Sequence, residues 1–298
     1  MAGEFILSES RVQYAQESVW GVLPGVPSYQ ELPVRDFGLH IARPLVRAES
    51  SIGGYQQRYV SSPHKVLTGA LSTFLWPTIA EAQLDMGIKR TSGAMNSYAF
   101  EINDEGAIDE GRRYLGCKAN TLRIGSDAEG ALVTMEYDLI AQSMAYISKF
   151  SAPGDQPTDE PYIFQMGAFT IDGAADANIE SFNIEISNNL QVGPQGSSRQ
   201  IIYLQEGLLV VTANFTLAYN SDDYQDYLIA ATEGSFSVVF THTKAGSPTS
   251  TVTLTIASGY ITQGPITGGP GEVRKQAITL EGRYNGTNNI IVHTVTSP

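Results

Sequence analysis

Apolar and polar side chains alternate with a period of two residues along much of this chain, and this pattern constrains its fold more than any other feature. In Leu208–Tyr219, for example, Thr212, Asn214 and Thr216 would share one face of a strand, with apolar residues on the other. The pattern predicts further strands at Thr121–Ile124, Leu132–Ile140, Ser181–Ser187, Ser235–Phe240, Thr251–Ile256, Ala277–Tyr284 and Ile290–Val295. Turn residues separate these segments, so the chain is predicted to be an all-β antiparallel sandwich or split barrel.

Two short helices are predicted to flank the strands. The first begins at Pro77, which suits a first helical position because its missing N–H is not needed there, and ends at Gly87. The second begins at Ser221, a good N-cap followed by two aspartates, and ends at Gly234.

The two helices also indicate a faint internal repeat. Val66–Trp76 leads into the first helix and Leu208–Asn220 into the second, and Tyr114–Gln142 resembles Tyr260–Tyr284 in layout. Because strand–helix–strand units are common, duplication and coincidence explain this repeat equally well. The segment Ser151–Pro161 is expected to be a surface connector between the halves.

Three regions are expected within a single compact domain. Residues 1–65 have sparse periodicity and several prolines, and they are expected to form a long N-terminal arm and loop that contribute to the core. Residues 66–150 would form the first half of the sandwich, and residues 151–298 the second. A stretch as irregular as the first region is improbable in a compact domain unless it binds something.

The charge of the chain limits the partners it can bind. The net charge is −13, and residues 151–298 carry 5 basic against 14 acidic side chains. Such a chain lacks the cationic surface that phosphate binding needs, so it should not grip DNA. An acidic surface could instead line a conduit through which DNA slides without sticking.

No motif in the sequence organises an active site. The four histidines are dispersed, and none has the spacing of metal ligands. The acidic residues around Asn103–Gly106 lack the spacing of a calcium loop, which favours a solvated loop over a cation site. The one cysteine, Cys117, is expected to be a small buried side chain. The chain is therefore expected to be no enzyme and to bind no cofactor or metal.

The N-terminal sequence has no basic segment followed by an apolar core, and no apolar run approaches the roughly 18 residues of a membrane span. The chain is therefore expected to fold in a reducing cytoplasm and not to contact a membrane.

Several short segments, in order along the chain, carry a resemblance to a known family. They are Glu17–Gly21, Leu32–Val34, Arg47–Ser50, Thr68–Ser72, Tyr114–Leu122, Asp127–Gly130, Leu132–Ile140, Phe169–Gly173 and Ile179–Leu190. Each segment is short and degenerate, but together they span most of the chain. The chain resembles the tail tube (major tail) proteins of bacteriophages with long, non-contractile tails. It departs from the family's pattern in a longer final third, with a Gly-rich segment at Gly264–Gly271.

The resemblance implies a structural virion protein of the tail, assembled in the host cytoplasm. Subunits would join edge to edge into hexameric rings that stack into a tube, and DNA would pass through the central channel during ejection without specific binding. A tape-measure protein, a tail-tip complex and a tail terminator are the further partners implied.

The resemblance also suggests where assembly residues lie. The loop Leu39–Gln57 would contact the next ring. The candidate contact residues are Arg43, Arg47, Glu49 and Ser50 in the loop and Arg58 just after it. Ordinary surface ion pairs explain these arginines equally well. Thr212, Asn214 and Thr216 are candidates for the channel lining, but outer solvent exposure remains an equal alternative.

Two other classes of protein remain open. The first is another virion β-sandwich, such as a decoration protein or a tail terminator, and related tubes also occur in bacterial contractile and secretion systems. The second is a carbohydrate-binding β protein, which aromatic residues beside two carboxylates in one cleft would favour.

Overall fold

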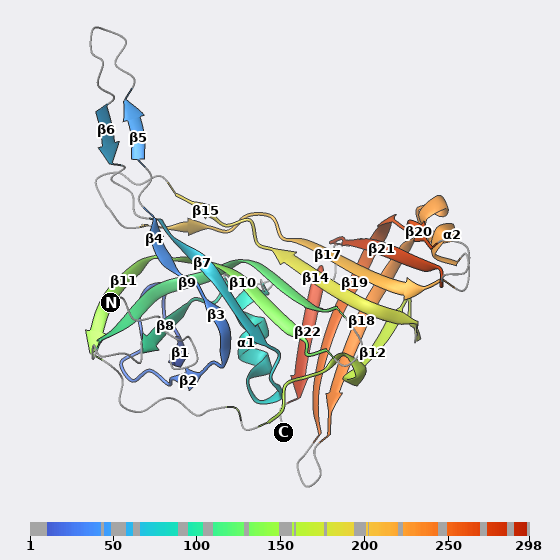
Figure 1. Cartoon of the computed structure of the whole chain (residues 1–298), viewed down its shortest axis with the longest axis horizontal. Coiled ribbons are helices and arrows are strands. Elements are labelled where there is room, and N and C mark those ends of the chain that lie inside the picture. The colour runs from blue at the N-terminus through green and yellow to red at the C-terminus, as the bar shows by residue number, and fades with distance from the viewer. Residues whose placement is uncertain are drawn as a thin grey trace.

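The computed structural model describes residues 11–42, 45–48, 58–61, 66–88, 95–103, 110–127, 131–148, 157, 159–175, 178–193, 201, 203–219, 223–243, 249–268, 273–284 and 289–296. Within these residues the chain is mostly antiparallel β-structure with two short α-helices, and the large sheet that they form is not closed into a barrel. The predicted all-β class is thereby confirmed. Figure 1 shows the two halves side by side along the longest axis.

The first half of the chain contains eleven strands, a short 3-10 helix and one α-helix. They are β1 (Arg11–Gln16), β2 (Gln30–Glu31), β3 (Val34–Phe37), β4 (His40–Ala42), β5 (Leu45–Ala48), β6 (Arg58–Ser61), β7 (Val66–Phe74), η2 (Pro77–Ile79), α1 (Ala80–Gly87), β8 (Tyr98–Asn103), β9 (Glu110–Ser126), β10 (Thr134–Ala141) and β11 (Ser143–Ser148). The helical segment from η2 to α1 has the bounds predicted for the first helix.

The second half contains another eleven strands, a 3-10 helix and one α-helix. They are η3 (Phe164–Met166), β12 (Gly167–Ile171), β13 (Ala174–Ala175), β14 (Ile179–Ser187), β15 (Gln191–Val192), β16 (Leu204–Gln205), β17 (Val210–Ala218), α2 (Asp223–Ala230), β18 (Glu233–His242), β19 (Ser250–Gln263), β20 (Ile266–Thr267), β21 (Lys275–Gly282) and β22 (Ile291–Thr296). Every segment in which alternation predicted a strand lies in one of these strands or overlaps one.

The two halves share one scheme of strand pairing. β7 pairs with β3, β4 and β10, and β17 pairs correspondingly with β14 and β21. β9 pairs with β8, β10 and β11, and β19 pairs correspondingly with β18, β21 and β22. The two-stranded ribbon β1–β2 on β8 has its counterpart in β12–β13 on β18. Each half also contains a separate hairpin, β5–β6 or β15–β16, and a helix that follows β7 or β17.

Irregularities in the strand register recur at matching positions. The β3–β7 ladder skips Arg35, and the β14–β17 ladder skips Glu180. The β9–β10 ladder skips Asn120, and the β19–β21 ladder skips Thr262. The β8–β9 and β18–β19 ladders also shift at equivalent points. A β-bulge inserts one extra residue at a defined position of a strand. Bulges at matching positions therefore align the two halves residue by residue. The halves are therefore structural repeats, and coincidence no longer explains the sequence pattern.

Strand pairing between β9 and β14 joins the repeats into one sheet. Thr121–Ser126 of the first repeat pairs with Phe182–Ser187 of the second. The order across this part of the sheet is β7, β10, β9, β14, β17, β21, β19, β18 and β12. The repeats thus share a continuous sheet.

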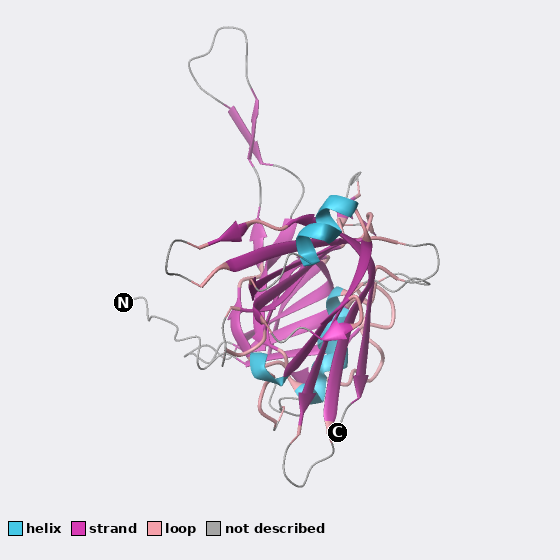
Figure 2. Ribbon diagram, turned by 90° about the vertical axis from the view of Figure 1, so that its right-hand side faces the viewer, coloured by secondary structure: helices cyan, strands magenta, loops and turns pink. Residues whose placement is uncertain are grey.

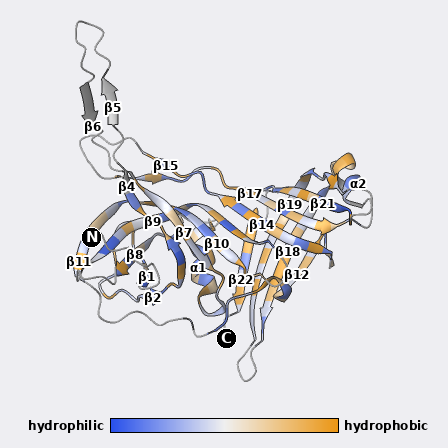
Figure 3. Ribbon diagram, in the orientation of Figure 1, coloured by the Kyte–Doolittle hydropathy of each residue, from blue (hydrophilic) through white to orange (hydrophobic). Residues whose placement is uncertain are grey.

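The core lies on one face of this sheet and is rich in aromatic residues. In the first repeat, Phe37 lies 5.9 Å from Phe100 and 5.8 Å from Tyr114, measured between ring centroids. In the second repeat, Phe182 lies 5.4 Å from Phe169 and 5.6 Å from Phe240. Figure 3 shows apolar and polar residues alternating along the strands, as expected where one face is buried.

Two regions differ from the sequence-based expectation. Residues 11–42 contain four paired strands, where only an arm of sparse periodicity was expected. Four successive residues of β1, Val12–Ala15, are buried, and a strand covered on both faces shows no alternation. The second helix ends at Ala230, before Ala231 with its positive φ of 48°, and the predicted last residue, Gly234, lies inside β18.

Candidate functional site: a polar sheet face

A row of polar side chains crosses the face of the main sheet opposite the core. Strand pairing aligns Ser72 of β7, Glu136 of β10, Arg123 of β9, Glu185 of β14, Thr212 of β17, Glu281 of β21 and Tyr260 of β19. Directly paired residues point to the same face of a sheet, so these side chains form one line across both repeats.

A second, uncharged row runs beside the first. It contains Thr134, Gly125, Asn183, Asn214 and Thr279. The Thr279 hydroxyl donates to Asn214 Oδ1 at 2.8 Å, so two strands are also tied through their side chains on this face. The two rows together make a hydroxyl- and amide-rich surface.

Carboxylates outnumber cations on this face. Arg123 Nε donates to Glu185 Oε2 at 2.9 Å, and Arg123 Nη1 donates to Asp138 Oδ2 at 3.2 Å. The hydrogen bond to Glu185 raises the pKa of Arg123 above its ordinary value. Glu136 and Glu281 add negative charge in the same row, with no second cation among the residues of that row. The arrangement repels phosphate groups.

The predicted lining residues all lie on this polar face. Thr212, Asn214 and Thr216 occupy alternate positions of β17; Asn214 is exposed, and the two threonines are half-buried. Their intervening neighbours, such as Phe215, are buried in the core.

Of the predicted assembly loop, Leu39–Gln57, the structure describes residues 39–42 and the strand β5, which forms a hairpin with β6 just beyond the predicted end. Arg47 belongs to β5 and pairs with Tyr59, and Arg58 belongs to β6 and pairs with Ala48, so the hairpin brings their backbones close together. Arg43, Glu49 and Ser50 lie outside the described residues. The two strands form a sheet of their own that stands away from the main sheet in Figures 1 and 2.

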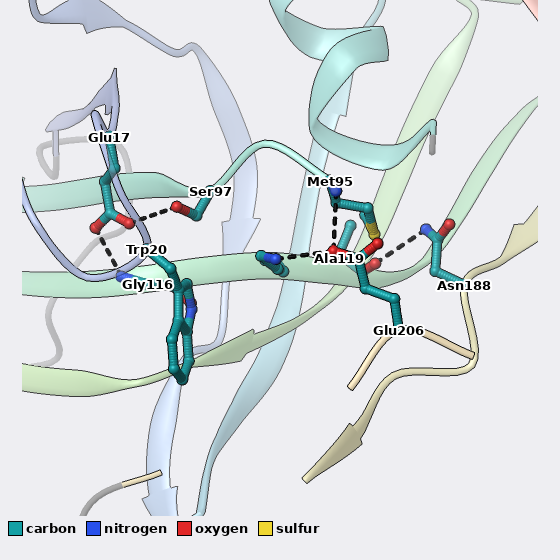
Figure 4. A network of polar contacts seen from close by, with 9 residues as sticks. Glu17, Trp20, Met95, Ser97, Gly116, Ala119, Asn188 and Glu206 are labelled. Carbon is teal, nitrogen blue, oxygen red and sulfur yellow. Dashed lines mark hydrogen bonds and ion pairs between the residues drawn. The ribbon is translucent and has the colours of Figure 1, made fainter. Parts of the chain in front are cut away.

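A buried carboxylate anchors the N-terminal segment to the corner of the sheet. Glu17 accepts hydrogen bonds from the Gly116 amide and the Ser97 hydroxyl, each at 2.7 Å (Figure 4). It also accepts one from the Gly21 amide at 2.7 Å. Trp20 Nε1 donates to the Gly116 carbonyl at 2.9 Å. Gly116 has a φ of 68° and lies where β9 passes from its pairing with β11 to its pairing with β10. Glu17–Gly21 therefore holds the bend in β9.

A second network ties the repeats together. Glu206 Oε1 of the second repeat accepts from Lys118 Nζ and from the Met95 amide of the first, each at 2.9 Å (Figure 4). Asn188 Nδ2 donates to the carbonyls of Gly87 at 2.8 Å and Ala119 at 3.0 Å. These contacts are nearly dry, because Lys118 and Asn188 are buried.

Sequence reasoning missed several of these residues. Arg123 and Glu185 lie in predicted strands. Their polar positions in the alternation indicated only that they belong to an exposed face. Only strand register reveals that they are neighbours. Glu17 entered through the family resemblance, and nothing local indicated that its carboxylate is buried.

The described residues give little support for a chemical site. They contain no cluster of three metal-binding side chains, and neither described helix has the length and apolar character needed to cross a membrane. One surface pocket is lined by Phe164 and Phe169 without a carboxylate, and another by Asp172 and Glu233 without an aromatic ring. Neither pocket combines the aromatic rings and paired carboxylates of a carbohydrate site. Cys117 is buried, as predicted, and burial raises the pKa of its thiol. The acidic residues 104–109 lie outside the described part of the chain.

The fold defines the class of protein. It is an all-β protein of two sheet repeats, with rows of polar side chains across one face of the main sheet. The sequence model of a family described as phage tail tube protein matches residues 8–283, and the chain belongs to that family. It is therefore a structural component of a virus tail. A comparison with curated proteins finds no matching relative.

Proposed function

We propose that this protein forms stacked rings of six tube units around a channel through which DNA passes during ejection. The polar face of the main sheet lines that channel. One observation carries the proposal: the row from Ser72 to Tyr260 is continuous across both repeats and carries one cation against three carboxylates. Such a surface lets DNA slide because no phosphate finds a lasting partner.

The hairpin β5–β6 contacts the neighbouring ring in this proposal, with Arg43, Arg47, Glu49, Ser50 and Arg58 as its candidate residues. The position of β5–β6 away from the main sheet supports this role, because a projecting ribbon can reach another ring. Residues 11–42 belong to the first repeat, so the inter-ring role falls to the hairpin β5–β6, and the two repeats form one compact tube domain. Assembly takes place in the host cytoplasm with a tape-measure protein, a tail-tip complex and a tail terminator.

Assembly is tested by negative-stain electron microscopy and light scattering of the purified, concentrated chain, with and without its tail-tip complex. Hollow tubes or stacked rings of uniform width are expected. A particle that stays monomeric at every concentration, even with the tail-tip complex, would overturn the proposal.

The channel lining is tested by cysteine accessibility in assembled tubes. Asn214→Cys should react with a small maleimide but be protected from one attached to a large polymer, because the polymer enters only at the tube ends. The matched control is Ala168→Cys on β12. Phe169 of β12 faces Phe182 of β14 across the core, so these two strands lie in opposite layers. The exposed side chain of Ala168 therefore points outward on the side of the molecule opposite to the polar rows of β14 and β17. Equal labelling of both positions by the large reagent would contradict the assignment of the polar face to the channel.

A further inference from the structure

The contact between the two repeats has two parts. The first is the ladder in which β14 of the second repeat pairs with β9 of the first. The second is the packing of α1 of the first repeat against β22 of the second, where His293 Nε2 lies 3.1 Å from Asp85 Oδ1. Between β22 and β9 of its own repeat, most of α1 is buried, including Leu84, Asp85 and Met86. One repeat thus presents a strand edge and a helix, and the other presents a strand edge and β22.

The second repeat carries the same pair of features as the first, but uncovered. β20 continues the line of β19, and Thr267 pairs with Lys275 as Gly125 pairs with Thr134 in the first repeat. The residues Gln263–Gly268 are therefore the counterpart of the β9 edge that holds β14. Among the described residues, the strand register pairs them with β21 alone, so no strand covers their outer edge. Ile266 in this edge is 41% exposed.

The helix α2 lies beside that open edge. Gln225 Nε2 of α2 donates to the Gly264 carbonyl at 2.6 Å. The alignment of the repeats continues to the residues just before the helices. There the Leu75 amide donates to the Val133 carbonyl, and at the matching position the Tyr219 amide donates to the Arg274 carbonyl. Counting from these bonds, Ile229 is the counterpart of Asp85. Ile229 is 80% exposed, whereas Asp85 is buried beneath β22.

The first repeat presents the complementary features at the other end of the molecule. β3 and β4 are the counterparts of β14, and within the described residues only β7 pairs with them. β11 is the counterpart of β22, and its Tyr146 matches His293, because Tyr146 pairs with Arg112 as His293 pairs with Leu254. Tyr146 is 71% exposed. Figure 1 shows β4 and β11 toward one end of the long axis and α2 and β20 toward the other.

We propose that a second copy of this chain covers these surfaces and that the contact between chains repeats the contact between the two halves. β3–β4 of one chain then pairs with Gln263–Gly268 of the next, and Tyr146 packs on Ile229. The polar contact of Asp85 with His293 inside the chain is matched by an apolar contact between chains. Two large side chains this exposed gain free energy when they are buried against each other.

The repeat fixes the number of chains in a ring. A head-to-tail contact between identical surfaces closes into a ring when its rotation permits. This inference rests on the proposed function, in which a ring holds six tube units. Because each chain contains two such units, three chains close the ring, whereas the family resemblance alone implied six chains.

The test is covalent cross-linking of assembled tubes carrying Tyr146→Cys and Ile229→Cys. The native Cys117 is buried and should not react. A short bismaleimide should join each chain to the next, and a denaturing gel should show species up to three times the 32.2 kDa of the chain and none larger. The matched control replaces Tyr146→Cys with Ala145→Cys, an exposed neighbour on the opposite face of β11, which should cross-link poorly.

The outcomes separate this inference from the proposed function. A ladder that ends at six chains would overturn the three-chain ring, and tubes of uniform width without cross-links would overturn the assigned contact. In both cases the tube itself stands, although a ring of six chains would hold twelve units and not the proposed six. A wild-type chain that forms neither rings nor tubes with its tail-tip complex would overturn both.

Discussion

Gly116 shows how a single residue determines the path of the longest strand. Its φ of 68° disfavours any side chain, and a Cβ there would lie 2.6 Å from Gln142 Cβ and 2.8 Å from Trp20 Nε1. The bend therefore requires glycine for two separate reasons, backbone conformation and space.

Gly116→Ala should lower the free energy of unfolding by roughly 3 kcal/mol, since left-handed strain and overpacking add together. Gly173→Ala is the matched control, because Gly173 has a φ of 77° but no atom near its potential Cβ. It should cost only about 1 kcal/mol, from backbone strain alone. Denaturant unfolding of the two variants measures the difference, and equal losses would show that the contacts with Trp20 and Gln142 are unimportant.

Buried tyrosines should make the protein sensitive to alkali. Burial raises the pKa of Tyr14 and Tyr137 above the ordinary 10.0. Below pH 10 the phenols are neutral in both the folded and the unfolded chain, so they do not lower the free energy of unfolding. As the pH rises further, the unfolded chain ionises first, and the free energy of unfolding falls.

This loss should approach about 1.4 kcal/mol per pH unit for each such tyrosine. Urea unfolding at several pH values between about 9 and 11 measures the slope. Tyr137→Phe should make it shallower, although the variant also loses the hydrogen bond to the Gln83 carbonyl. Tyr146→Phe, at an exposed site, is the matched control for the loss of one phenol. A stability that does not change over this range would contradict the expectation.

At the scale of elements, the open edge of β20 makes a separate prediction. The Pro265 carbonyl accepts from the Ala277 amide of β21 at 3.1 Å, and successive residues of a strand face alternate edges, so the Ile266 amide faces outward. Ile266→Pro thus removes a donor from the outer edge without removing a ladder bond inside the chain.

Ile266→Pro should leave the fold intact and raise the critical concentration for assembly at least about tenfold, which corresponds to 1.4 kcal/mol. Ile266→Val, which keeps the amide, should assemble nearly as the wild type does. Light scattering against concentration measures assembly, and circular dichroism checks the fold. An unchanged critical concentration for the proline variant would show that this edge is not a contact between chains.

The sequence predicted the positions of strands better than it predicted which strands pair with each other. Alternation located β14, β17 and β21 because each has one buried and one polar face. It missed β1, where burial on both faces removes the pattern, and it extended the second helix to Gly234 because glycine is a common helix end. The repeat in the sequence was faint because Asp85 and Ile229, or His293 and Tyr146, share position but not chemistry. Strand register, which aligns them, depends on contacts far apart in the chain.

At the scale of the whole molecule, the two repeats explain the unequal exposure of matching elements. The helix α1 is buried between β9 of its own repeat and β22 of the other, while α2 lies at one end of the molecule (Figure 1) with Ile229 exposed. The strand edges follow the same rule, because β14 is paired and β3–β4 is open. Open strand edges promote association between chains. In a tail tube protein, we propose, that tendency builds the ring.

The most direct test is a cryo-electron microscopy map of tubes assembled from the wild-type chain. We expect the row containing Arg123 and Thr212, and the neighbouring Asn214, to face the channel, with six matching units in each ring. A map in which this polar face lies on the outside of the tube, or is buried against another subunit, would contradict it.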